Sequence, residues 1–61
     1  MTPTEQIDAL LNLVDPDRTP DLKQGQRLKV LGLAVTRGKG FWPSQAGWNL
    51  LGDRGRAFDV N

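Results

Sequence analysis

Basic side chains around a glycine-rich turn are the groups in this sequence that could do chemistry. Arg37 and Lys39 alternate with glycine over residues 37–40, and three more bases precede them in residues 22–36. No acidic residue interrupts residues 22–48. Guanidinium groups bind phosphate oxygens as a planar fork, and ammonium groups bind them as a point charge. The candidate chemistry is therefore phosphate binding, and the candidate nucleic-acid contacts are Lys23, Arg27, Lys29, Arg37 and Lys39.

The residue types in this sequence give little support for nucleophilic catalysis or for metal binding. The sequence contains no cysteine and no histidine, which excludes disulfides and thiolate metal sites and removes the commonest general base. Ser44 is the single serine and has no histidine or cysteine to activate it, so its place before a helical segment predicts an N-cap. Asp15, Asp17 and Asp21 lack the spacing of a calcium loop. We therefore predict a protein that is not an enzyme and uses no metal and no cofactor.

Charge is distributed unevenly along the chain. Residues 1–21 carry five acids and one base, a balance of −4, whereas residues 22–61 carry seven bases and two acids, a balance of +5. An uneven field of this kind can steer a polyanion to one side of a small domain. The alternative is a solvated surface whose charges serve solubility alone.

Length limits the chain to one domain spanning residues 1–61. A domain of this size buries only about 60% of the surface that its unfolded chain exposes, and oligomerisation, here a homodimer, is the remedy left when disulfides and metals are absent. No window reaches the roughly 18 apolar residues of a membrane span. No signal-peptide pattern opens the sequence either, so a cytoplasmic location is the expectation.

The first element that must support the basic residues is a helix over residues 3–14. Thr2 is placed as its N-cap and Pro3 as its first residue, and Glu5 completes a capping box. Apolar residues recur at helical spacing along one face. They are Ile7, Leu10, Leu11 and Val14.

A second helix is predicted over residues 20–31, because Thr19 and Pro20 repeat the pattern of a cap followed by proline. Its inward residues would be Leu22, Leu28 and Leu31, with Gly25 weakening the helix and Gly32 ending it. The apolar run over residues 28–35 leaves a second interpretation open, in which this segment is a buried strand.

A hairpin and a third helix follow. Residues 33–36 suit a strand, residues 37–40 supply two glycines for a tight turn, and Phe41 and Trp42 begin the return strand, which Pro43 ends. Side chains alternate along a strand, so one of the two aromatics should point inward and the other should stay exposed as a contact residue.

Ser44 then begins a helix that runs to about Leu51, where Gly52 or Gly55 stops it. The residues available for packing in this helix are Ala46, Trp48, Leu50 and Leu51. In the tail that follows, Phe58 is expected to fold back onto the core.

Short motifs over residues 26–55 resemble the C-terminal half of winged helix-turn-helix domains. Leu31-Gly32-Leu33 matches the turn into the wing, and Pro43-Ser44-Gln45-Ala46-Gly47 matches the element that opens the last helix. The resemblance implies a reduced winged-helix-like α+β fold with the order helix, helix, β-hairpin (wing), helix, and DNA as a partner. A full winged helix has three helices before the wing, whereas this chain has room for two. The second helix would therefore stand in the place of the recognition helix without its usual supporting helix.

Two functions follow from these observations. The first is a small bacterial or phage transcription regulator that binds DNA through backbone phosphates, using the wing and the second helix. The alternative is a protein–protein interaction module, such as a small phage-type accessory protein, that uses an exposed Phe41 or Trp42 and the acidic first helix.

Overall fold

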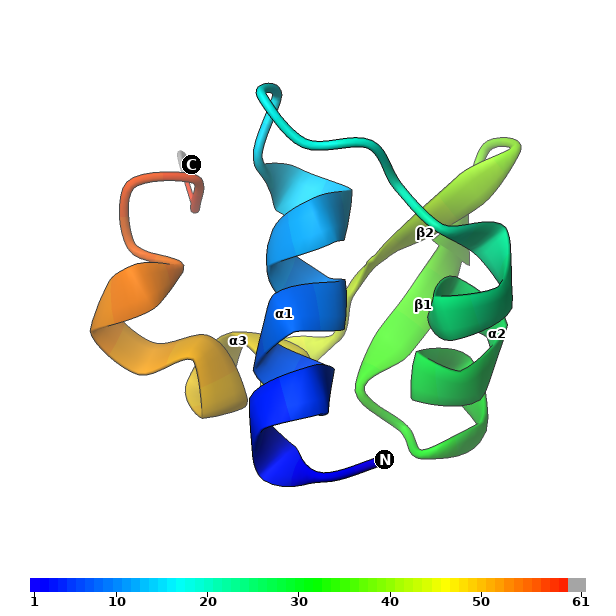
Figure 1. Ribbon diagram of the computed structural model, residues 1–61, viewed down its shortest axis with the longest axis horizontal. Helices are drawn as coiled ribbons and strands as arrows, with labels where there is room; N and C mark the ends of the chain where they lie inside the picture. Colours follow the sequence, from blue (N-terminus) through cyan, green and yellow to red (C-terminus); the bar gives the residue numbers. More distant parts are fainter. Residues whose placement is uncertain (60–61) are drawn as a thin grey trace.

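The computed structural model describes residues 1–59 and confirms the predicted α+β order of helix, helix, hairpin and helix (Figure 1). α1 lies in the middle of the molecule, with α2 and the hairpin on one side and α3 on the other (Figure 1). The elements are α1 (Pro3–Val14), α2 (Leu22–Val30), β1 (Ala34–Arg37), β2 (Gly40–Pro43), α3 (Gln45–Leu51) and a short 3-10 turn, η1 (Gly52–Arg54).

α1 begins and ends at the predicted residues because its signals are local. The Glu5 backbone N–H donates to the Thr2 hydroxyl at 3.2 Å, and the Thr2 backbone N–H donates to Glu5 Oε1 at 3.1 Å. This reciprocal capping box satisfies two helix-terminal donors. At the other end, Asp15 takes an extended conformation before Pro16, as the proline requires.

α2 begins at Leu22, so the prediction of a helix starting at Pro20 was wrong by two residues. Asp21 is the N-cap in place of Thr19, because its carboxylate accepts from the backbone N–H groups of Lys23 at 2.9 Å and Gln24 at 3.4 Å. A carboxylate at this position also interacts favourably with the helix dipole.

Gly32 stops α2 as predicted. Its φ of 78° lies in the left-handed region that favours glycine. The Leu33 N–H donates to the Leu28 carbonyl at 2.8 Å and the Gly32 N–H to the Lys29 carbonyl at 3.0 Å, which together form a Schellman motif. Residues 28–30 are therefore helical, and the interpretation of residues 28–35 as one strand is wrong.

The buried face of α2 is centred on Gly25 and Leu28, which confirms the prediction for Leu28 alone. Leu22 is 60% exposed and Leu31 is 50% exposed, although both were expected to face inward. The reason is that the Phe41 ring lies directly against Gly25, so the helix packs on the hairpin through its glycine.

β1 and β2 pair antiparallel, with Ala34 opposite Pro43 and Arg37 opposite Gly40. The loop between them is Gly38-Lys39, and Gly38 has a φ of 57°, as a type II′ turn requires at its first position. Gly40 lies in β2 with a negative φ, so only one of the two turn glycines uses the left-handed region.

Ser44 ties α3 to the end of α2. Its hydroxyl accepts from the Gly47 N–H at 3.2 Å and donates to the Gly32 carbonyl at 2.7 Å, and its own N–H donates to the Leu33 carbonyl at 3.0 Å. The predicted N-cap role is confirmed, and the helix ends at Leu51 before Gly52, also as predicted.

The core lies where α1, α2, β1 and α3 meet. Its buried members are Ala9, Leu10, Leu28, Ala34 and Leu51, of which Leu10 and Leu28 are fully buried. Trp48 and Leu50 pack partly buried against this cluster as expected, whereas Ala46 is exposed. Phe58 is half-buried and lies outside the cluster, and Val60 of the same tail is beyond the described residues. Within residues 1–59, no helix is both long and apolar enough to cross a membrane.

Candidate nucleic-acid interface

The five predicted contact residues come from two elements. Lys23, Arg27 and Lys29 lie on α2, Arg37 is the last residue of β1, and Lys39 lies in the hairpin loop. All five are exposed, and none takes part in an ion pair with any residue that the structure describes. Their charges are therefore available to an anionic partner.

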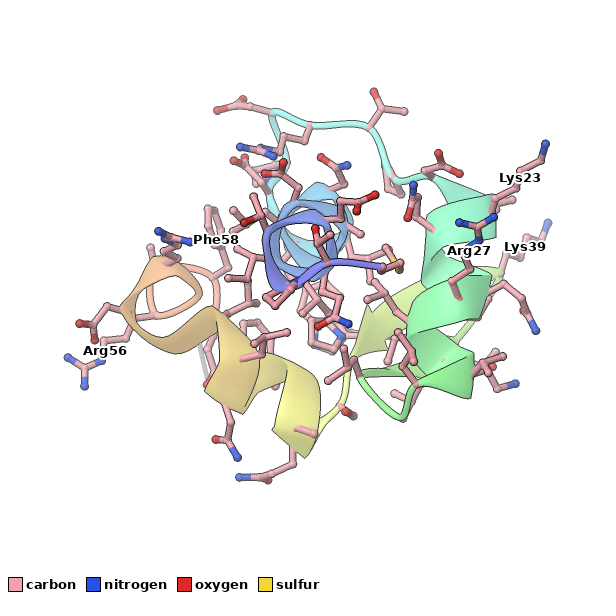
Figure 2. The ribbon with its side chains drawn as sticks, turned by 60° about the horizontal axis from the view of Figure 1, so that its bottom comes forward. Lys23, Arg27, Lys39, Arg56 and Phe58 are labelled. Carbon is pink, nitrogen blue, oxygen red and sulfur yellow. The ribbon has the colours of Figure 1, made fainter. Side chains whose placement is uncertain are left out.

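Three of these cations lie on one side of the molecule. Lys23 and Arg27 are four residues apart on α2, so they share one flank of the helix. α2 packs against both strands of the hairpin, and Figure 2 shows Lys39 on the same side as Lys23 and Arg27. We call Lys23, Arg27 and Lys39 the basic side.

Lys29 and Arg37 lie elsewhere. Helical geometry places Lys29 about 120° around α2 from Lys23, in the last turn, where a cation is favoured by the helix dipole. Arg37 shares a face of the hairpin with Val35 and Trp42, whereas Phe41 on the opposite face packs against α2. The five candidates therefore form the basic side and two separate cationic positions.

Arg37 does not project freely from the hairpin tip. It ends β1 and so precedes the loop, and its guanidinium carbon lies 4.4 Å from the centre of the Trp42 ring. Trp42 in turn meets Trp48 edge to face, with ring centres 5.9 Å apart and an interplanar angle of 68°. The side chain is exposed but lies over an aromatic surface.

The expected exposed aromatic is not found, because Phe41 and Trp42 are both half-buried. Phe41 is covered by α2, and Trp42 lies between Arg37 and Trp48. The large exposed hydrophobic residues in the described part of the chain are aliphatic instead: Met1, Leu22, Val30, Leu31 and Val35.

A surface hollow of about 360 Å³ lies beside the basic side, and the sequence analysis did not foresee it. It is lined by Met1, Gln26, Arg27, Val30 and Leu31. Val30 is 78% exposed there, on the outward face of α2. The sequence did not predict this hollow because the helical periodicity assigned Leu31, one of its lining residues, to the core.

Arg18 lies in the loop between α1 and α2 and belongs to the acidic part of the molecule. Its guanidinium lies 3.7 Å from a carboxylate oxygen of Asp8 and 3.7 Å from one of Asp15, and it donates to the Asn12 side chain at 3.3 Å. These contacts neutralise its charge locally, so it is not a candidate contact.

The start of α1 is electrostatically linked to α2. The backbone N–H and then the hydroxyl of Thr2 hold the pKa of Glu5 below its ordinary value, and the N-terminal amino group and Arg27 lower that pKa further. Arg27 therefore lies close enough to α1 to influence a carboxylate, although the two form no ion pair.

Within residues 1–59, no group of three acidic, histidine or cysteine residues could hold a metal ion. Comparison of the chain with family models, with curated proteins and with solved structures gives no match.

Proposed function

We propose that this chain is a small non-enzymatic regulator that binds duplex DNA mainly through backbone phosphates. The observation that carries the proposal is the basic side, where α2 and the hairpin loop present Lys23, Arg27 and Lys39 together, none of them in an ion pair with a described residue. Phosphate contacts position a protein on a duplex but carry little sequence information. We therefore propose weak sequence selectivity, and a cytoplasmic location where bacterial or phage DNA is accessible.

The order of elements supports a reduced winged-helix scaffold for this function. The hairpin takes the place of the wing, and α2 precedes it as a recognition helix would. With one supporting helix missing, a homodimer would provide a second basic side and increase affinity through two linked contacts. Sedimentation of the protein with and without DNA tests this assembly.

Removal of charges from the basic side, and from Arg37 together with it, tests the main proposal. Lys23→Ala combined with Arg27→Ala, and Arg37→Ala combined with Lys39→Ala, should each weaken binding to a fluorescent 20-base-pair duplex about ten-fold or more. The matched control is Arg54→Ala with Arg56→Ala, which removes the same charge from the other end of the molecule, where Figure 2 shows Arg56. Equal effects of the three pairs, or no binding by the wild type at low salt, would contradict the proposal.

A protein-interaction module is the second candidate, and the aliphatic hollow favours it. Val30 and Leu31 are exposed beside Met1, and apolar side chains grouped in this way are typical of protein contacts. The covered aromatics Phe41 and Trp42 no longer support it. A stoichiometric partner that survives nuclease treatment and is lost on Val30→Asp would favour this function over DNA binding.

A further inference from the structure

The outer face of the hairpin carries a group of three side chains in contact, Arg37, Trp42 and Trp48. The Arg37 guanidinium carbon lies 4.4 Å from the centre of the Trp42 indole, and Trp48 of α3 braces that indole at 5.9 Å. Arg37 is exposed, whereas both tryptophans are half-buried. The exposed guanidinium of Arg37 therefore rests on two half-buried aromatic side chains that contact each other.

The orientation of the stack matters for anion binding. A guanidinium that lies over an indole uses its planar face for the cation–π contact, and its N–H donors point outward from its edge. A free arginine loses rotamer freedom when it binds a ligand, whereas a stacked arginine has already lost much of that freedom. The indole can therefore raise the affinity of Arg37 for phosphate without touching the phosphate.

We propose that Trp42 is a positioning residue that holds the Arg37 guanidinium ready to contact a DNA phosphate, with Trp48 fixing the plane of the indole. This inference rests on the proposed function. It distinguishes Arg37 from Lys39, which lies in the loop and acts as an unconstrained charge.

Charge and positioning have different signatures in a salt titration. Loss of a phosphate contact makes the plot of log affinity against log salt shallower by about 0.9 for each contact. Loss of positioning alone lowers the affinity while the number of phosphate contacts, and hence the slope, stays the same.

We therefore expect Arg37→Ala to weaken duplex binding about five-fold and to reduce the slope by about 0.9. Arg37→Lys and Trp42→Leu should each weaken binding about three-fold with an unchanged slope. Trp42→Leu in the Arg37→Ala background should have no further effect, because the two residues act as one unit. Trp42→Phe, which keeps an aromatic face, should restore most of the affinity.

Val35→Thr is the matched control, because Val35 is exposed and lies directly opposite Trp42 on the same face of the hairpin. This substitution should leave DNA binding unchanged. The Arg37 Nε–Hε resonance, shifted by the indole ring current, should move on Trp42→Leu even without DNA. Arg37→Lys alters an exposed residue, so wild-type affinity in this variant would overturn the positioning role even if Trp42→Leu unfolds the domain.

Three results would overturn the inference, in two different ways. Wild-type affinity in Arg37→Lys, or additive effects of Trp42→Leu and Arg37→Ala, would overturn the positioning role while DNA binding stands. Failure of the wild type to bind duplex at low salt would overturn the inference together with the proposed function.

Discussion

Gly25 shows how a missing side chain can decide where a helix packs. A Cβ atom at this position would collide with the Phe41 ring, so the close contact between α2 and β2 exists because residue 25 is glycine. Helix propensity alone treats this glycine as a cost of about 1 kcal/mol relative to alanine. The contact with Phe41 reverses that expectation.

Gly25→Ala should therefore destabilise the domain, although it favours the isolated helix. Overpacking of a core contact costs about 1–3 kcal/mol, which exceeds the gain of about 1 kcal/mol in propensity. We expect a net loss of about 1 kcal/mol in the free energy of unfolding, measured by urea denaturation. Gln26→Ala, at the exposed neighbouring position, is the control and should change stability little. A more stable Gly25→Ala variant would show that the Phe41 ring moves aside freely.

Glu5 makes stability depend on pH at the acidic end of the range. Hydrogen bonds from Thr2, followed by the N-terminal amino group and Arg27, hold its pKa below the ordinary value of 4.5 in the folded state. A carboxyl whose pKa is lowered by folding stabilises the protein above its unfolded pKa, and this contribution is lost as pH falls through the folded pKa.

The variant Glu5→Gln separates this effect from that of the other acids. Glutamine keeps the side-chain acceptor of the capping box but does not titrate. The unfolding free energy of the wild type should fall more steeply than that of Glu5→Gln as pH drops below 4.5. Thermal unfolding from pH 6 to pH 2.5 measures both proteins, and parallel curves would exclude a role for this carboxylate.

At the level of elements, the sequence was sufficient where signals are local. α1 was predicted to the residue because the cap, the proline and the capping box all lie within its first turn. The turn at Gly38 and the cap at Ser44 were found for the same reason. Each of these features depends on neighbours only a few residues away.

Tertiary contacts decided what the sequence could not show. Thr19 was predicted as the cap, and only the structure shows that Asp21 binds the first N–H groups of α2 instead. Leu28 was placed correctly on the inward face of α2, but Gly25 at the centre of that face was missed because it carries no apolar signal. Arg37 and Trp42 lie five residues apart on opposite strands, and their stacking depends on hairpin register.

At the level of the whole molecule, the lopsided charge of the sequence becomes a division in space. Arg18 is neutralised by Asp8 of α1 and by Asp15 at the end of α1, whereas Lys23, Arg27 and Lys39 on the basic side form no ion pair with any residue in 1–59. The candidate residues were predictable because exposed cations are visible in the sequence. Their separation into a basic side, Lys29 and Arg37 was not, because it depends on how α2 packs on the hairpin.

This division predicts a steep dependence of DNA affinity on salt. Three to five phosphate contacts imply a loss of about 40- to 500-fold in affinity between 50 and 200 mM salt. Fluorescence anisotropy with duplexes of two unrelated sequences measures both the slope and the selectivity. A slope near zero would mean that the cations do not contact phosphates, and a large difference between the duplexes would mean that base edges are read.

The two-stranded sheet of the described chain has an open margin along each strand. Unpaired backbone groups on such margins can recruit strands from other molecules and start fibrils. In this protein each strand is only four residues long. β2 ends at Pro43, which has no backbone N–H to donate, and β1 ends at the charged residue Arg37. The hairpin is therefore too short and too well terminated to template amyloid growth, even though it stands at the surface of a very small domain.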